Sequence, residues 1–160
     1  MQWTLERLPR DGEIAPVEAF ARDVLHGLCR NPKSIPPCYF YDDEGSRLFQ
    51  QITALEEYYP TRCELEILQN HRGELAEAVG GEPFELIELG PGDGSKTEWL
   101  LREFLDRGLS FEYVPIDISY DALAAAHDDL ARRFPELEIL PLCADYTADH
   151  ELPFPRVEPR

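Results

Sequence analysis

The apolar residues in the first half of the chain recur at three- and four-residue spacing, a period typical of amphipathic helices. It predicts three helices, over 16–30, 46–55 and 61–79. The apolar stripe of the second helix, which we expect to face a core, contains Leu48, Phe49, Ile52 and Leu55. At the start of the third helix, Thr61 and Glu64 have the spacing of a capping box. We therefore assign residues 1–82 to an N-terminal helical segment.

From residue 83 onward the pattern changes to short apolar runs separated by helical stretches. The runs predict strands over 84–89, 111–116 and 137–142, and the stretches between them predict helices over 95–107 and 120–134. This alternation indicates βαβ units, and so an α/β fold with a parallel sheet. Right-handed crossovers place the strands side by side in the order 3-2-1. We assign residues 83–147 to this part and residues 148–160, which have no periodicity, to an irregular tail.

The chain is strongly acidic. Its 160 residues include 15 Lys and Arg against 32 Asp and Glu, which gives a formal net charge of −17. Nucleic-acid backbones and anionic membrane surfaces are bound through basic patches, and the longest basic run here is Arg132-Arg133. We therefore expect neither a nucleic-acid partner nor a membrane partner.

The cysteine and histidine residues form no pattern that indicates chemistry. No cysteine belongs to a CxxC pair, and no histidine lies at metal-ligand spacing from a cysteine. Residues 1–13 carry charges of both signs and lack the apolar run of a signal peptide. We therefore expect a cytoplasmic protein with reduced thiols, no metal ion and no side-chain nucleophile.

A glycine-rich stretch over 88–97 joins the first predicted strand to the next helix. Glycine permits a tight turn and lets backbone N–H groups approach a ligand without an intervening Cβ. A P-loop would need glycine where Ser95 stands, and a dinucleotide-binding loop would need its third glycine one residue after Gly94. A plain turn would need one glycine rather than three. The E-x-G-x-G-x-G loop of S-adenosylmethionine-dependent methyltransferases fits without adjustment, with Glu88, Gly90, Gly92 and Gly94.

Acidic residues follow the next two predicted strands. Asp117 ends the second strand, where a carboxylate can accept hydrogen bonds from both ribose hydroxyls of an adenosine. Alternatively, Asp117 or Ser119 caps the helix that follows. Asp145 and Tyr146 come just after the third strand, where a methyltransferase contacts the adenine amino group and an aromatic residue can stack on the ring. Alternatively, Asp145 is a turn residue.

Several blocks of sequence together resemble one methyltransferase family. In the N-terminal segment they are Pro32 to Pro37, Tyr39 to Asp42, Gly45 to Phe49 and Glu57 to Arg62. The glycine loop, Val114 to Asp117 and Asp145-Tyr146 continue the match in the expected order. The family is the histidine-specific Nα-methyltransferases of ergothioneine biosynthesis and their bacterial relatives. The resemblance covers residues 33–146 and implies a Rossmann-like methyltransferase fold, whose sheet is incomplete here, behind an N-terminal helical segment.

The resemblance also implies a role for each matching residue. The cofactor would be S-adenosylmethionine, or its product S-adenosylhomocysteine. Tyr41, Gly90 and Lys96 would lie at its methionine portion, Asp117 at the ribose, and Asp145 with Tyr146 at the adenine. Phe49 would line the substrate pocket, and Tyr58 would reach the imidazole of the substrate. Without the resemblance, the tyrosines would be packing residues and Lys96 a surface residue of the first helical turn.

The reaction implied is methyl transfer to the amino group of a small amino acid, with L-histidine as the expected substrate. Members of the family are longer than this chain, and their later part supplies further strands and a substrate-binding domain. A second class stays open, in which the chain is a catalytically incomplete cofactor-binding or protein-interaction module. In both classes the strand over 84–89 would be an open sheet edge. We therefore expect a homodimer, with coverage of the edge by the chain's own N-terminal helices or tail and docking onto a C-terminal half as the alternatives.

Overall fold

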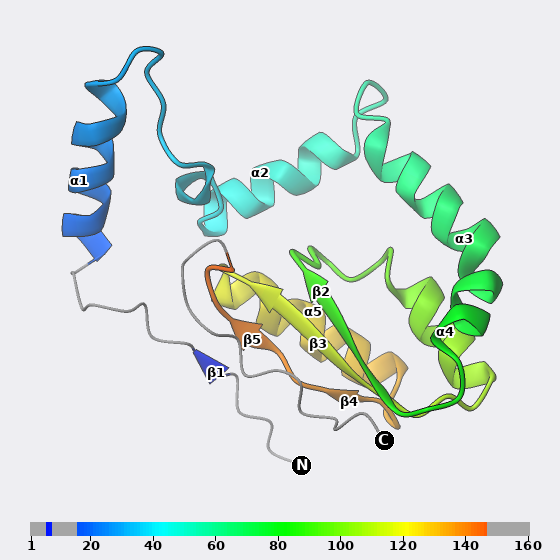
Figure 1. Cartoon of the computed structure of the whole chain (residues 1–160). Helices are drawn as coiled ribbons and strands as arrows, with labels where there is room; N and C mark the ends of the chain where they lie inside the picture. Colours follow the sequence, from blue (N-terminus) through cyan, green and yellow to red (C-terminus); the bar gives the residue numbers. More distant parts are fainter. Residues whose placement is uncertain (1–5, 8–15, 147–160) are drawn as a thin grey trace.

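A computed structural model describes residues 6–7 and 16–146 of the chain. At its centre lies a parallel sheet with the strand order β1-β5-β3-β2, in which β4 also pairs with β3 (Figure 1). The strands are β1 (Glu6–Arg7), β2 (Phe84–Leu89), β3 (Phe111–Asp117), β4 (Glu138–Ile139) and β5 (Leu142–Cys143). The run β5-β3-β2 is the order 3-2-1, so the predicted Rossmann-like α/β fold with an open parallel sheet is confirmed.

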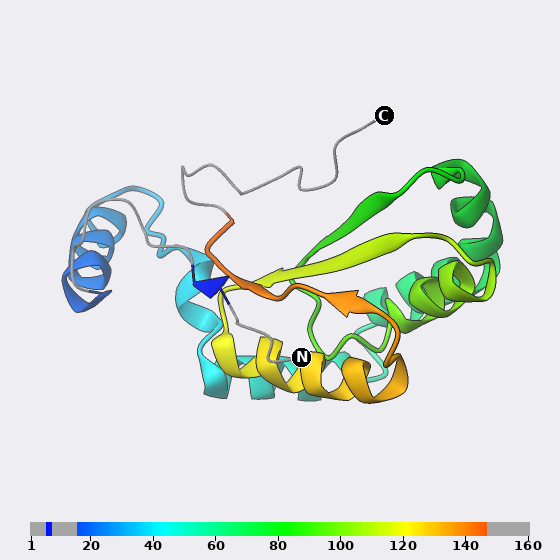
Figure 2. The same ribbon diagram turned by 90° about the horizontal axis from the view of Figure 1, so that it is seen from below.

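The two crossover helices, α4 (Glu98–Asp106) and α5 (Tyr120–Arg133), lie on the same side of the sheet (Figure 2). Right-handed crossovers that step in one direction require this arrangement. The core between helices and sheet contains Leu101, Tyr113, Leu130, Phe134, Leu137 and Ile139. Since successive strand side chains point to opposite faces, neighbouring residues form a second cluster, which contains Val114, Ile116, Leu142 and Ala144.

The third predicted strand is divided into two short strands. Both β4 and β5 pair with β3, but the strand predicted over 137–142 is interrupted between them. Pro141 has no N–H to donate to a ladder, so pairing continues through the Leu140 N–H, which donates to Tyr113 O at 2.8 Å. The two-residue strand β1, which pairs with β5, was not predicted because so short a strand shows no period.

The N-terminal helical segment contains α1 (Pro16–Leu28), the 3-10 helix η1 (Pro37–Phe40), α2 (Asp43–Thr53) and α3 (Pro60–Val79). α3 packs on α4, where the Arg72 guanidinium donates to Glu103 at 3.1 Å and lies 5.6 Å from the centre of the Trp99 ring. α2 lies beyond the carboxyl ends of β2 and β3, and α1 stands apart from the sheet (Figure 1). The assignment of residues 1–82 and 83–147 to separate parts stays a prediction, and the predicted tail over 148–160 lies outside the described residues.

The start of α3 corrects the predicted capping box. The helix begins at Pro60, with Tyr59 as its N-cap and no side-chain capping hydrogen bond. Proline is favoured at the first helical position because its φ already suits a helix. The N–H that proline lacks would have no intrahelical partner at that position in any case. Thr61 therefore lies inside the helix, and the Glu64 carboxylate instead accepts a hydrogen bond from Lys96.

The apolar stripe of α2 is also less covered than predicted. Leu48, Ile52 and Leu55 are 46, 42 and 52% exposed, whereas we expected them to face a core. Phe49, from the same stripe, lines a cavity. The difference arises because the described elements cover only the side of α2 that faces α5 and the loop after β2.

Candidate functional site

A cavity of about 680 Å³ lies where the carboxyl ends of β2 and β3 meet α2 and α5. Open α/β sheets bind ligands at this edge, because the loops that leave adjacent strands form a crevice there. Six residues with predicted contacts line the cavity, namely Tyr41, Phe49, Gly90, Gly92, Asp117 and Tyr146. The other four, Tyr58, Gly94, Lys96 and Asp145, lie outside its lining.

The loop after β2 has a backbone that favours glycine at three places. Gly90, Gly92 and Gly94 have φ angles of +66°, +61° and +72°, in the left-handed region that strains other residues. Gly94 is buried, and a Cβ there would lie 3.0 Å from Leu130 of α5. A Cβ on Gly92 would project toward Gln50 of α2, 3.7 Å from its side-chain nitrogen. Gly94 therefore packs the loop onto α5, while Gly90 and Gly92 keep the cavity wall free of side chains.

Asp117 brings a carboxylate to the wall of the cavity. Its Oδ1 accepts a hydrogen bond from the Ser119 backbone N–H at 2.9 Å. Burial raises the pKa of this carboxyl above the ordinary value of 3.8, and backbone N–H groups oppose part of that rise. Ser119 caps α5, since its hydroxyl oxygen accepts from the Ala122 N–H at 3.3 Å. Of the two capping alternatives, Ser119 is therefore the one observed, and Asp117 stays at the ligand edge of the sheet.

Three aromatic side chains form a row that leads out of the cavity. The ring centres of Tyr41 and Phe49 lie 6.2 Å apart, and those of Phe49 and Tyr58 lie 5.9 Å apart, both with edge-on geometry. Edge-on pairs at this distance are favourable aromatic contacts. The structure thus brings Tyr58 next to Phe49, one ring away from the cavity.

A known family matches this combination of fold and loop. The family described as “Histidine-specific methyltransferase, SAM-dependent” matches residues 20–159, which include every predicted site residue. The chain belongs to this family. The resemblance inferred from the sequence blocks is therefore confirmed.

Individual relatives carry related names. The chain is 43% identical over 145 residues to a histidine N-alpha-methyltransferase of Mycobacterium tuberculosis, which covers 91% of this chain and 44% of the relative. It is 43% identical over 129 residues to the enzyme of the same name in Mycolicibacterium smegmatis, over 81% of this chain and 40% of the relative. Ergothioneine biosynthesis protein 1 of Neurospora crassa is 36% identical over 92 residues, or 58% of this chain and 10% of the relative. The chain thus spans less than half the length of these relatives.

Against the roles expected for this family, Lys96 is the largest departure. Its ammonium group lies 2.6 Å from Oε2 of Glu64 on α3, outside the lining of the cavity. Asp145 lies two residues after the end of β5 and is half-buried. The next residue, Tyr146, lines the cavity. The structure therefore places Tyr146 directly at the site, whereas a ligand contact of Lys96 would require the Glu64 pair to open.

Sequence reasoning missed the polar residues that reach the cavity from helices. Ser46, Arg47 and Gln50 of α2 line it, together with Asp129 of α5. Ser46 and Gln50 are four positions apart, so they share a helix face with the cavity-lining Phe49 between them. That spacing is visible in the sequence, but only the packing of α2 against the glycine loop shows that this face meets a ligand site.

The described residues lack two other kinds of site. Among them, no group of three or more His, Cys, Asp and Glu side chains is arranged to hold a metal ion. No helix in the described part combines the length and the apolar content needed to cross a membrane.

Proposed function

We propose that this chain is the cofactor-binding part of an S-adenosylmethionine-dependent methyltransferase that methylates the amino group of L-histidine. The observation that carries the proposal is the cavity at the carboxyl ends of β2 and β3, which gathers Gly90, Gly92, Asp117 and Tyr146. Family membership and the names of the relatives support the choice of reaction and substrate. All four cysteines lie in the described residues and none forms a disulfide there, which suits a reducing compartment, so we propose a cytoplasmic location.

The residues present fit the cofactor. The absent side chains at Gly90 and Gly92 leave room for its methionine portion beside Tyr41, with Lys96 as a further contact after release from Glu64. The Asp117 carboxylate would accept hydrogen bonds from the ribose hydroxyls, and Tyr146 with Asp145 would hold the adenine. When bound, the cofactor supplies a methyl group on a sulfonium sulfur, and the amine nitrogen forms the new bond while the C–S electrons stay on sulfur.

The aromatic row would form the substrate side of the site. Phe49 lies in the cavity wall, and Tyr58 packs against it at 5.9 Å from ring centre to ring centre. In the proposal, Phe49 excludes water from the methyl group, and the Tyr58 hydroxyl reaches the imidazole. The contribution of these residues is alignment and desolvation, because the electrophile is already reactive. No side chain in this proposal acts as a nucleophile.

A second candidate function, a cofactor-binding module without catalysis, is favoured by the open edge of the sheet. β2 is the last strand in the order, and its Ile87 and Leu89 are 41 and 53% exposed. Such an edge is a template for another strand. We propose that a segment equivalent to the C-terminal part of the longer relatives pairs there, and that without it the chain binds cofactor but does not turn over.

Titration calorimetry with S-adenosylhomocysteine tests the cofactor proposal. We expect saturable binding of one ligand per chain, since the cavity is formed by described residues of this chain alone. Adenosine serves as a comparison ligand that keeps the ribose and adenine contacts and lacks the methionine portion, and it should bind more weakly. Absence of binding for both ligands would overturn the proposal for this chain.

A further inference from the structure

The two ends of the glycine loop are tied together by a side-chain contact. Glu88 precedes the loop at the end of β2, and Thr97 follows it directly before α4. The Thr97 hydroxyl lies 2.6 Å from both carboxylate oxygens of Glu88. This hydrogen bond closes the base of the loop, so the entry and the exit of the loop cannot move apart without breaking it.

A third residue joins the same carboxylate from the neighbouring strand. The Tyr113 hydroxyl of β3 donates to Oε2 of Glu88 at 2.5 Å. Tyr113 is completely buried, and Thr97 is 5% exposed. Burial, together with the charge of Glu88, raises the pKa of Tyr113, so its hydroxyl keeps the proton it donates.

Glu88 is half-buried, and removing a carboxylate from water is unfavourable unless hydrogen bonds replace the lost water contacts. An apolar side chain in place of Glu88 would allow the same strand pairing with β3. The polar arrangement adds geometric specificity, because the hydroxyl groups of Thr97 and Tyr113 must both point at the Glu88 carboxylate. It fixes the start of α4 relative to both β2 and β3.

We propose that Glu88, Thr97 and Tyr113 form a positioning triad that holds the glycine loop in its ligand-binding conformation. The inference rests on the proposed cofactor site. None of the three lines the cavity, so they would act through the loop and not by touching the ligand. Because the loop is ordered before the ligand arrives, binding does not have to supply the cost of ordering it.

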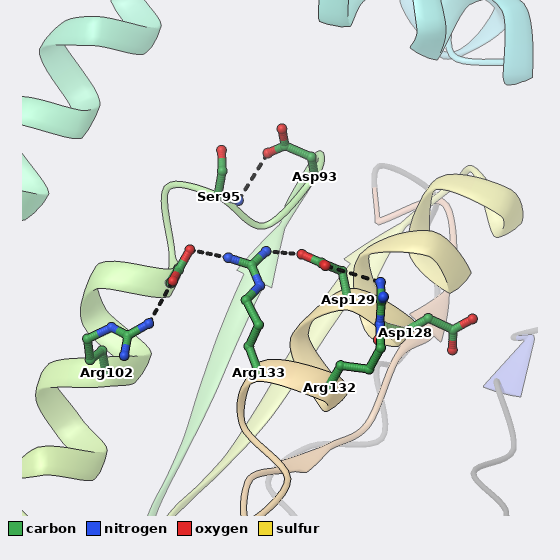
Figure 3. Close-up of polar contacts among 8 residues, drawn as sticks. Asp93, Ser95, Arg102, Asp128, Asp129, Arg132 and Arg133 are labelled. Atoms are coloured by element: carbon green, nitrogen blue, oxygen red, sulfur yellow. Dashed lines mark hydrogen bonds and ion pairs between the residues drawn. The ribbon is translucent and has the colours of Figure 1, made fainter.

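Glu98, the residue that follows Thr97, provides a matched comparison. It is the first residue of α4 and, like Glu88, carries a carboxylate. Its partners Arg102 and Arg133 are surface arginines (Figure 3). Exposed ion pairs of this kind have small effects on stability and are screened by salt. Removing the Glu98 charge should therefore leave the loop in place, whereas removing a hydroxyl of the triad should not.

The experiment measures the affinity for S-adenosylhomocysteine and, without ligand, the amide exchange of residues 92–96. Thr97→Val and Tyr113→Phe should each weaken binding about tenfold and speed exchange by a similar factor, as expected for a lost hydrogen bond to a charged group. Thr97→Ser restores the hydroxyl and should behave like the wild type. Glu98→Gln should change both quantities by less than about twofold.

A further variant separates positioning from general destabilisation. Phe111 is the first residue of β3, at the opposite end of the strand from the cavity, and its ring packs against Phe84 and Phe104. Phe111→Leu alters this aromatic cluster. It should lower the melting temperature without changing affinity. Unchanged affinity and unchanged loop exchange in both Thr97→Val and Tyr113→Phe would overturn the triad. If the wild type binds no S-adenosylhomocysteine, the cofactor proposal fails, and the exchange of the ligand-free loop still decides whether the triad orders it.

Discussion

The strand-and-helix region and the N-terminal helical segment are packed very differently, although both contain amphipathic helices. In the strand-and-helix region, Leu101, Tyr113 and Leu123 are completely buried. Among the described residues of the N-terminal segment, Ala76 is the only buried apolar residue, and Val17 and Leu25 are 77 and 64% exposed. The first region supplies both surfaces of its own core, whereas the helices of the second present apolar stripes without a complete partner.

The candidate site lies on the border between these two regions. Gly90, Gly92 and Asp117 come from the packed region, while Tyr41 and Phe49 come from the open one. This chain should therefore still bind the cofactor, because the main contacts lie at the end of β3 and in the loop that packs on α5 through Gly94. Methyl transfer should depend on the open region being completed.

The largest expected effect is on turnover. The isolated chain should transfer no methyl group to free L-histidine, because its substrate side is formed by the incompletely covered α2 and the segment around Tyr58. Transfer of label from the cofactor to histidine, compared with a heat-inactivated sample, measures this. Turnover above that control would show that the N-terminal aromatic residues suffice for the substrate side of the site. It would also show that methyl transfer does not depend on further coverage of the N-terminal segment.

Asp117→Ala should produce the largest loss of cofactor affinity among single substitutions. It removes a charge-assisted acceptor, which is worth about 1.5–3 kcal/mol. Calorimetry with S-adenosylhomocysteine measures the change. Asp121→Ala removes a carboxylate in the first turn of α5, outside the lining of the cavity, and should leave affinity unchanged. Equal affinities of wild type and Asp117→Ala would exclude Asp117 from the site.

The raised pKa of Asp117 gives binding and folding opposite dependences on pH. Binding needs the ionised carboxylate, so affinity should begin to fall at a higher pH than the ordinary value of 3.8 would give. In folding, a raised pKa means that the folded state holds more protons than the unfolded state between the two values. The wild type should therefore lose stability relative to Asp117→Asn as the pH rises through that window.

Calorimetric titrations and thermal melts over a series of pH values check both trends. Asp117→Asn is the reference for the stability measurement, since it keeps the shape of the side chain and cannot ionise. The two trends must have opposite signs for the assignment to stand. A stability difference that grows in favour of the wild type with rising pH would mean that the folded state lowers this pKa.

The backbone-determined parts of the site were predictable from the sequence, and the parts that depend on packing were not. Gly90, Gly92 and Asp117 were located because a parallel sheet directs the ends of its strands to one edge. Gln50 and Asp129 reach the cavity only through the packing of two helices. A hydrophobic period does not specify that packing, because it shows which face of a helix is apolar but not what covers it.

Local rules failed where a specific residue overrode them. Pro60 moved the start of α3 and removed the capping box that Thr61 and Glu64 predict. Pro141 interrupted the third strand without changing its place in the sheet. The Glu64 carboxylate, freed from the cap, pairs with Lys96, which was expected to face the cofactor. In each case a contact between distant segments or the geometry of proline decided the outcome.

The open edge of β2 should make the isolated chain dimerise at low micromolar concentration. Ile87→Lys replaces a side chain that is 41% exposed on this edge, and it should weaken association about tenfold, because a charge on an edge strand opposes pairing. Val79→Lys, at a 40% exposed position on α3, is the matched control and should have no effect. Sedimentation velocity measures both. A wild-type monomer whose β2 amides exchange slowly would show that the chain covers its own edge.

The smallest expected effect concerns the ion pairs between α4 and α5. Arg133 reaches from α5 to Glu98 on α4 and also pairs with Asp129 (Figure 3). Arg133→Gln should lower the free energy of unfolding by about 0.5–1 kcal/mol at low ionic strength, as expected for exposed pairs. In 1 M salt the loss should nearly vanish, because the screening length falls to about 3 Å. Urea unfolding at the two salt concentrations measures it, and Arg132→Gln, whose contacts stay within α5, should cost less. A large, salt-independent loss would mean that Arg133 acts through packing and that this region depends on more than its apolar core.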